Sequence, residues 1–237
     1  MPDGSSEFTI PDRFYVGVGA PRAGTTWWHS LIRRHPEAVY AQKELKHFAN
    51  VVPRKVPDAE SYARKFNPDA IRLQGEWTPR YMYDPWGMMR LAKVVPHARI
   101  LAILRDPWDR AVSGFLRAQN DRLASAVWMM NDAIEKSLYA RQVERIYEAY
   151  PAESVLILQF EKLIDSPEPH LERTYRHLGF EDTGHLPTDY RAKVNASTTT
   201  IDELVPEVEI ASKREFTKDA ERLIELVPDL DLSLWPS

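Results

Sequence analysis

The sequence predicts a single α/β domain in which helices cover both faces of a central parallel β-sheet. Short apolar runs rich in β-forming residues alternate with longer stretches of helical periodicity along the chain, a pattern typical of parallel strands joined by helices. The first apolar run enters a glycine-containing turn that opens a helix. The length of 237 residues suits one domain over 1–237, large enough to bury a substantial core. We expect 1–10 to form a flexible N-terminal segment.

Short stretches of four to six residues, most of them apolar, supply the expected strands. They lie at 13–18, 38–41, 71–76, 99–104 and 155–160. The run at 99–104 is almost wholly apolar, as expected of a strand buried on both faces, and it lies between Pro96 and Pro107. It is therefore the clearest central strand.

Helical sequence follows most of these runs. The expected helices lie at 26–34, 85–95, 107–119, 125–150, 167–178 and 208–226. The third follows Asp106, a good capping residue, and begins with Pro107, which favours the first helical position. Gly179 ends the fifth, because glycine readily adopts the left-handed conformation that terminates helices. The remaining expectations are a surface excursion with a little helix at 53–70, a loop at 184–203, and a tail packed onto the body at 234–235.

The composition excludes several classes of protein. The chain has no cysteine, which rules out disulfides, zinc–thiolate sites, iron–sulfur clusters and thiol nucleophiles. Its 31 Lys and Arg against 35 Asp and Glu give a net charge of −4, so we expect no nucleic-acid partner. No apolar run approaches the roughly 20 residues of a membrane span, and the N-terminus lacks the basic start and apolar core of a signal peptide. We therefore expect a cytoplasmic protein with no membrane partner.

A glycine-rich turn between the first strand and the first helix is a candidate phosphate site. Gly19 and Gly24 have the spacing of a nucleotide P-loop, and Thr25 and Thr26 follow; backbone N–H groups surround a phosphate in such a turn. Thr25 stands where a P-loop has the lysine that reaches the β- and γ-phosphates, and Arg22 places a cation earlier in the turn. The pattern disfavours an ordinary ATPase or GTPase and favours one 5′-phosphate with one transferable group. A tight turn without a ligand is the alternative.

Two further features fit a nucleotide. Trp27 follows the turn and can stack on a base, although a buried aromatic residue that anchors the helix explains it almost as well. Arg105 ends the run at 99–104, at the edge where open parallel sheets bind ligands, and Ser113 falls on the helix that follows. A guanidinium and a hydroxyl so placed can hold one phosphate between them. Taken alone, the two residues are explained equally well without a ligand, with Arg105 in a surface salt bridge and Ser113 as an ordinary small residue of the helix.

The segment 21–27, Pro-Arg-Ala-Gly-Thr-Thr-Trp, resembles the 5′-phosphosulfate-binding loop of sulfotransferases that use 3′-phosphoadenosine 5′-phosphosulfate (PAPS). The segment 105–113 resembles the 3′-phosphate motif of the same family. The resemblance implies the P-loop NTPase-like sulfotransferase fold, sulfotransferase activity and PAPS as co-substrate, with Trp27 stacked on adenine. The residues that it implies in nucleotide binding are Arg22, Ala23, Gly24, Thr25, Thr26, Trp27, Arg105 and Ser113. Cytosolic members usually have lysine at the position of Arg22, whereas arginine is familiar there in bacterial members.

A glutamate just after the second strand is the candidate general base. Sulfuryl transfer to an alcohol needs a group that removes the acceptor's proton and cations that stabilise the leaving phosphate. The segment 43–48, Lys-Glu-Leu-Lys-His-Phe, resembles the Lys-Glu-x-x-x-Phe segment of carbohydrate-type and bacterial sulfotransferases, whose glutamate is the base. The resemblance therefore implies Glu44. Cytosolic phenol and steroid enzymes use a histidine, which makes His47 the competing candidate. Without the resemblance, both side chains would be interpreted as solvated polar groups.

The sequence departs from the family at the second cation. Several relatives have histidine where this chain has Lys46, and they have lysine before Ser/Thr-Pro where this chain has Trp77. We expect Arg22 to take the role of the missing lysine, with Lys46 or Lys43 assisting.

The acceptor is expected to be a small molecule or natural product that offers a hydroxyl or, second, an amine. No metal is required, because arginine, lysine and helix N-termini supply the positive charge. Lys193 lies in a stretch where relatives fold a loop over the nucleotide, which implies a contact, although the stretch lacks their Lys-Gly-Arg signature and an exposed polar loop is the alternative. The aromatic residues that permit an apolar acceptor pocket, or else belong to the core, are Trp28, Phe48, Trp77, Tyr81, Tyr83 and Trp86.

Two other functions remain open at the level of sequence. The first is a Mg²⁺-dependent P-loop kinase in which Asp106, after the apolar strand, is the acid that holds the metal. The second is a non-catalytic nucleotide-binding or regulatory module on the same scaffold.

Overall fold

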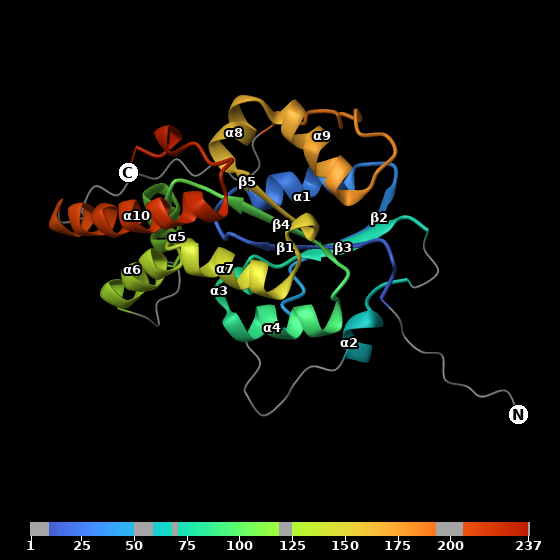
Figure 1. Ribbon diagram of the computed structural model, residues 1–237, viewed down its shortest axis with the longest axis horizontal. Helices are drawn as coiled ribbons and strands as arrows, with labels where there is room; N and C mark the ends of the chain where they lie inside the picture. The colour runs from blue at the N-terminus through green and yellow to red at the C-terminus, as the bar shows by residue number, and fades with distance from the viewer. Residues whose placement is uncertain (1–9, 50–58, 68–70, 119–124, 193–205, 237) are drawn as a thin grey trace, which may run out of the picture.

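The computed structural model describes residues 10–49, 59–67, 71–118, 125–192 and 206–236. In this part of the chain, five parallel strands form one sheet in the order β2-β3-β1-β4-β5 (Figure 1). The strands are β1 (Phe14–Gly19), β2 (Ala38–Lys43), β3 (Leu73–Trp77), β4 (Arg99–Leu104) and β5 (Val155–Gln159). Each coincides with an apolar run, so the predicted fold class is confirmed.

Helices cover both faces of the sheet, as Figure 1 shows. One face carries α1 (Thr25–Arg33), α8 (Phe160–Asp165) and α9 (Pro167–Leu178), and the other carries α3 (Arg80–Tyr83), α4 (Pro85–Val94) and α7 (Ala140–Ala149). A short helix, α2 (Ala59–Ala63), leads towards β3. Leu31, Leu91 and Leu171 point from three of these helices into one apolar core with the central strands. None of the helices in the described ranges has both the length and the apolar character needed to cross a membrane.

The order of the strands places the two sequence motifs side by side. From β1 the chain passes to β2 and β3 on one side of β1, and then crosses to β4 and β5 on the other side. The carboxyl ends of β1 and β4 therefore meet where the strand order reverses, which is where open α/β sheets bind ligands. Gly19 pairs with Ala102 in the register of β1 and β4, and the N–H of Ala20 donates to the carbonyl of Ile103 at 2.8 Å. The glycine turn and Arg105 thus leave the sheet from adjacent strands.

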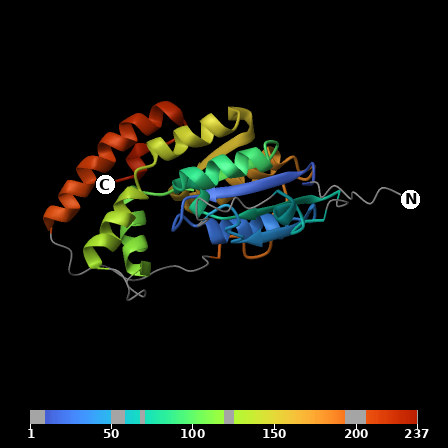
Figure 2. The same cartoon turned by 90° about the horizontal axis from the view of Figure 1, so that it is seen from below.

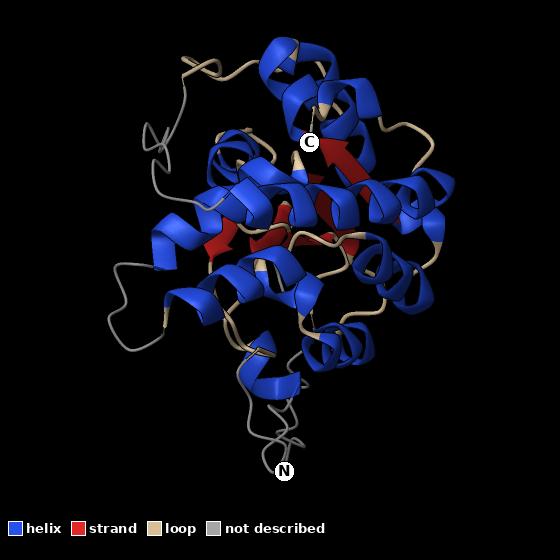
Figure 3. Cartoon of the chain, turned by 90° about the vertical axis from the view of Figure 1, so that its left-hand side faces the viewer, coloured by secondary structure: helices blue, strands red, loops and turns tan. Residues whose placement is uncertain are grey.

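Three helices form a second apolar cluster at one end of the sheet. They are α5 (Pro107–Ala118), α6 (Ala126–Glu135) and α10 (Pro206–Leu226). Their buried side chains include Phe115, Met130 and Phe216. Figure 2 shows these helices grouped at one end of the molecule, and Figure 3, viewed from that end, shows helices in front of the strands. Because α5 follows β4 directly, this cluster holds the start of α5 beside the sheet.

The helical stretch predicted at 125–150 is divided into α6 and α7. Asp219 of α10 caps the start of α7, because its carboxylate accepts the backbone N–H of Tyr139 at 2.6 Å and that of Ala140 at 3.2 Å. This acid caps α7 from a distant part of the chain, so no local pattern indicates it. The sequence also missed α3 and α8, and the strand predicted to reach Phe160 ends one residue earlier.

The chain near its C-terminus packs onto the body, as predicted. Trp235 is 6% exposed, and its indole N–H donates to the carboxylate of Glu161 at 2.9 Å. The other oxygen of Glu161 accepts the backbone N–H of Asp106 at 2.9 Å. Glu161 therefore joins the end of β4, the start of α8 and the C-terminal tail.

Candidate active site

At one position of the glycine turn, the backbone adopts a conformation that favours glycine. Gly24 precedes α1 with φ of 76°, in the left-handed region that disfavours side chains. A Cβ at this position would lie 2.4 Å from the ring of Phe160. Arg22 also has positive φ, at 70°. The turn is therefore held in a specific shape that brings the ring of Phe160 directly beneath it.

The structure brings both predicted phosphate motifs into contact. Arg22 Nε donates to Ser113 Oγ at 3.0 Å, and Arg105 Nη1 lies 3.4 Å from the carbonyl oxygen of Arg22. These residues are as much as 91 positions apart in the chain. The sequence predicted two separate phosphate contacts, and the structure shows that their side chains share one site.

Positive charge is concentrated at this site. Burial lowers the pKa of Arg22, and the nearby charges of Arg117 and Arg105 lower it further. The guanidinium of Arg105 lies 5.2 Å from the ring centroid of Phe160 and pairs with Asp109 at 2.8 Å. Its Nε is buried and has no hydrogen-bond partner among the described residues. A bound anion would offset the repulsion between these arginines and could accept hydrogen bonds from their guanidinium groups.

Two arginines of this region were missed at the level of sequence. Arg110 of α5 is 2% exposed, and it donates to the carbonyl of Pro21 in the turn at 3.1 Å and to the carbonyl of Ala133 on α6 at 2.7 Å. Arg117 stands four residues after Ser113 on α5. That spacing places the two on one helix face, and it is a signal from which Arg117 could have been predicted. Arg110 carried no such signal, because its partners come from distant segments.

The segment after β2 carries the predicted catalytic side chains. Lys43 Nζ donates to Thr25 Oγ1 at 3.0 Å, which places the end of β2 beside the glycine turn. Glu44 is exposed and pairs with Lys46 Nζ at 3.1 Å. His47 lies against α2, where its Nε2 is 3.3 Å from Ser61 Oγ. Of the two candidate bases, Glu44 is thus the one adjacent to a residue in contact with the turn.

A buried carboxylate at the end of β3 holds this segment in place. Glu76 is fully buried, and one of its oxygens accepts the hydroxyls of Tyr62 at 3.0 Å and Tyr81 at 2.9 Å. The other accepts the hydroxyl of Thr78 at 2.6 Å and faces the backbone N–H of Leu45 at 3.4 Å. Burial raises the pKa of Glu76, and these hydrogen bonds act in the opposite direction. The network connects β3 to the residue that follows Glu44.

Comparison with known proteins decides the family. The profile of the sulfotransferase domain matches residues 15–218. The chain belongs to the sulfotransferase family. Both phosphate motifs and the segment after β2 fall within the matched region.

The chain is similar to curated and solved members of this family. It is 23% identical over 194 residues to human heparan sulfate glucosamine 3-O-sulfotransferase 3B1. The aligned region covers 75% of this chain and 48% of the human protein. A sulfotransferase from Alicyclobacillus acidocaldarius has a TM-score of 0.73 at 23% identity, covering 97% of this chain and 100% of that one. Mouse SULT7A1, solved in complex with PAP, has a TM-score of 0.57 at 16% identity, covering 90% and 86% of the two chains. The chain spans about half or less of the length of the curated relatives it matches.

The other predicted site residues of this sulfotransferase are placed as follows. Trp27 is 7% exposed, and its indole N–H donates to the carbonyl of Tyr190 at 2.8 Å; its stacking on adenine stays a prediction. Lys193 lies outside the described residues. Four of the aromatic residues considered for an acceptor pocket are fully buried and belong to the core instead: Trp28, Phe48, Trp77 and Tyr81.

Replacing Glu76 by leucine should lower the free energy of unfolding of this sulfotransferase by about 3–5 kcal/mol, because it leaves buried hydroxyls and an N–H without their acceptor. Glu76→Gln should cost about 1–2 kcal/mol, since hydroxyl groups can rotate to accept from the new amide. Urea unfolding measures both values. The exposed Glu148→Gln on α7 is the matched control. Equal stability of Glu76→Leu and the parent would show that the network carries no stability.

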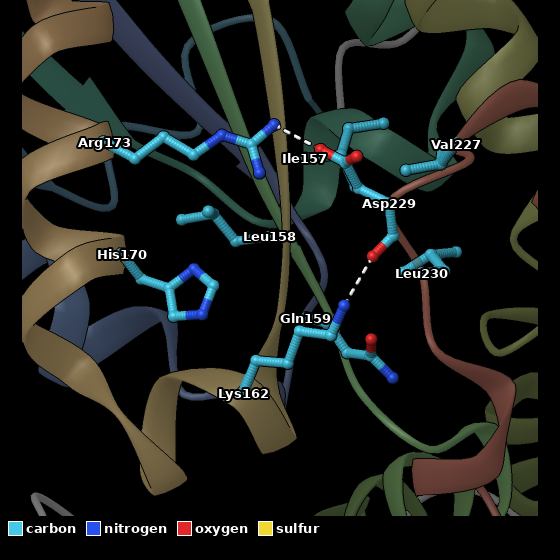
Figure 4. A pocket seen from close by; sticks show the side chains of 9 residues that line it. All are labelled: Ile157, Leu158, Gln159, Lys162, His170, Arg173, Val227, Asp229 and Leu230. Carbon is cyan, nitrogen blue, oxygen red and sulfur yellow. Dashed lines mark hydrogen bonds and ion pairs between the residues drawn. The ribbon is translucent and has the colours of Figure 1, made fainter.

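A pocket of about 260 Å³ lies elsewhere, between β5, α8, α9 and the segment after α10 (Figure 4). Its charged groups are largely paired, because Lys162 donates to the carbonyl of Asp229 at 2.6 Å and Arg173 pairs with the carboxylate of Asp229 at 2.6 Å. Burial and the charges of Arg173 and Lys162 lower the pKa of His170. Its lining includes none of the residues predicted to bind nucleotide, so the pocket is separate from the site at β1 and β4.

Proposed function

We propose that this chain is a PAPS-dependent sulfotransferase that transfers the sulfuryl group to a hydroxyl, or second an amine, of a small molecule or natural product. The contact of Arg22 with Ser113 and Arg105 carries the proposal. PAPS has phosphate groups at the 5′ and 3′ positions of one ribose, so its binding needs cations from two loops that meet. The membership of the chain in the family supports the same assignment, as does the buried Nε of Arg105, which has no hydrogen-bond partner within the described ranges.

The residues have distinct roles in the proposed reaction. The turn at 19–26 and Arg22 bind the 5′-phosphosulfate, and Arg105 and Ser113 bind the 3′-phosphate. Glu44 accepts the proton of the acceptor's hydroxyl as its oxygen attacks sulfur. A bond forms between the acceptor oxygen and sulfur, the bond between sulfur and the phosphate oxygen breaks, and the electron pair stays on the phosphate. Cations at the turn stabilise that charge as it develops.

The net charge of the chain disfavours one class of acceptor. A net charge of −4 disfavours a long polyanionic glycan, although the human relative is named for one. We therefore keep a small acceptor as the proposal, and we keep a cytoplasmic location as a prediction.

Sulfotransferase activity should appear as transfer of label from ³⁵S-PAPS to an acceptor in a screen of phenols, alcohols and amines, and it should persist in the presence of a chelator. The kinase alternative requires the opposite, namely turnover of ATP that a chelator abolishes. Asp106, the candidate metal ligand of a kinase, uses one carboxylate oxygen to accept the N–H of Asp109 at 2.8 Å and so caps α5. Tight binding of the product PAP without transfer to any acceptor would instead support the non-catalytic module and overturn the proposed activity.

A further inference from the structure

The family's lysine position on β3 is filled here by an aromatic ring. Trp77 is fully buried, and its indole occupies the space over β1 that a side chain at residue 17 would need, since a Cβ on Gly17 would lie 2.0 Å from the ring. Its indole nitrogen has no hydrogen-bond partner among the described residues. Trp77 fills this place and supplies no positive charge, so the second cation that the resemblance implies has to come from another position.

Lys43 supplies a positive charge beside that position. It ends β2 and pairs in register with Trp77 on the adjacent strand. Its Nζ lies 5.9 Å from the centroid of the Trp77 ring and donates to Thr25 Oγ1 at 3.0 Å. Thr25 is the first residue of α1, where a nucleotide P-loop has its phosphate-binding lysine. The ammonium of Lys43 therefore stands at the N-terminus of α1, between a hydroxyl and an aromatic face.

The other two candidate cations have different partners in the structure. Lys46 is exposed, and its Nζ pairs with Glu44 at 3.1 Å. Arg22 donates through Nε to Ser113, on the side of the site that faces α5. Within the described residues, Lys43 is the one of these three whose side chain donates a hydrogen bond to α1.

We propose that Lys43 is a catalytic residue that binds the 5′-phosphate and stabilises the phosphate oxygen released when its bond to sulfur breaks. The proposal rests on the proposed function and adds to it the identity of the second cation. In the step, the electron pair of the broken sulfur–oxygen bond stays on the phosphate oxygen, and the ammonium of Lys43 donates a hydrogen bond to it. That oxygen carries more charge in the product than in PAPS, so Lys43 binds the transition state and the product more tightly than the donor.

The surroundings of Lys43 suit this role. Burial lowers its pKa to about 8, and the negative charge of Glu44 opposes the shift. Thr25 faces it from α1 and Trp77 from β3; the acid next to Trp77, Glu76, is already bound to Thr78 and two tyrosines. The ammonium is therefore mostly protonated at neutral pH yet has lost much of its hydration, and an anion beside it gains more than it would in water.

Nucleotide affinities give the first test. Lys43→Met should weaken PAP about 10–100-fold in calorimetry and leave adenosine 3′-monophosphate, which lacks the 5′-phosphate, within about twofold. Lys43→Arg should recover most of the loss, because it restores the charge. Lys93→Met, which removes an exposed lysine of α4, is the matched control and should change neither affinity. Equal losses for both nucleotides, or none, would overturn the proposal.

The pH dependence gives the second test. Because the charged form is the active one and the pKa is lowered, kcat/KM should fall as pH rises above about 8. Lys43→Arg should move this fall in kcat/KM to higher pH, since the guanidinium stays charged.

An NMR titration measures the same lysine directly. In the ¹³C spectrum of reductively methylated protein, the signal of one lysine should titrate near pH 8. This signal should be absent in Lys43→Arg, and it should titrate at higher pH once PAP is bound. A fall in kcat/KM that stays near pH 8 in Lys43→Arg would overturn the assignment. An inactive parent with the predicted affinities would overturn the proposed activity and leave Lys43 at the 5′-phosphate.

Discussion

Glu44→Gln should lower turnover about 10²–10⁴-fold while PAP affinity stays within about twofold. Glutamine keeps the shape of the side chain and cannot accept the acceptor's proton, so the loss falls on the chemical step. Glu44 is exposed, and its negative charge raises the pKa of the neighbouring Lys43, so the affinity should be measured well below pH 8, where Lys43 stays charged in both proteins. Single-turnover transfer of ³⁵S and calorimetry with PAP measure the two quantities.

The second candidate base, His47, provides the comparison for this experiment. His47→Asn should reduce turnover by less than tenfold, because the ring packs against α2 and Phe48. Glu60→Gln on α2, an exposed acid paired with Arg64, is the matched control and should leave turnover unchanged. A loss in His47→Asn as large as that expected for Glu44→Gln, with full activity in the glutamine variant, would transfer the role of base to the histidine.

Arg105→Ala should weaken PAP by about 2–4 kcal/mol and hardly affect adenosine 5′-monophosphate. The side chain of Arg105 is 24% exposed, so its charge is shielded from water on most sides and the loss of a phosphate contact is large. The ring of Phe160 beneath it and the carbonyl of Arg22 beside it fix its direction. Calorimetry against both nucleotides gives the values directly.

The same strand provides the control for Arg105. Arg99 begins β4, is exposed, and donates to the carbonyl of Glu153 at 3.0 Å. Arg99→Ala removes an equal charge from the opposite end of the strand and should leave both affinities unchanged. Equal weakening of the two nucleotides in Arg105→Ala would refute a 3′-phosphate site at this position.

The parts of the fold that local physics determines were predicted well. The strand at 99–104 and the helix at 167–178 begin and end at the predicted residues, because the first is continuously apolar and the second begins with Pro167 and ends at Gly179. The division between α6 and α7 was not predicted, because the acid that caps α7 belongs to α10. Patterns along the chain cannot indicate a cap supplied across space.

The candidate site shows the same limit. The glycine turn was found from its spacing, whereas Arg105 and Ser113 were singled out mainly by the resemblance of the segment 105–113, and the structure brings these residues together. The contact of Lys43 with Thr25 was not predictable, because it depends on β2 ending in register with β3, at Lys43 and Trp77, and on the position of α1 beside that end. Glu76 was overlooked, since a charged residue in a strand does not show by itself that three hydroxyls surround it.

The carboxylate of Glu161 has a practical consequence for anyone who trims or tags this protein. It accepts from Asp106, the residue after Arg105, and also from Trp235, whereas the family match ends at residue 218. A boundary chosen from the match alone would remove the indole and leave the half-buried carboxylate of Glu161 with one partner fewer, beside Asp106. Shortened versions should keep Trp235, and a fused tag belongs beyond it.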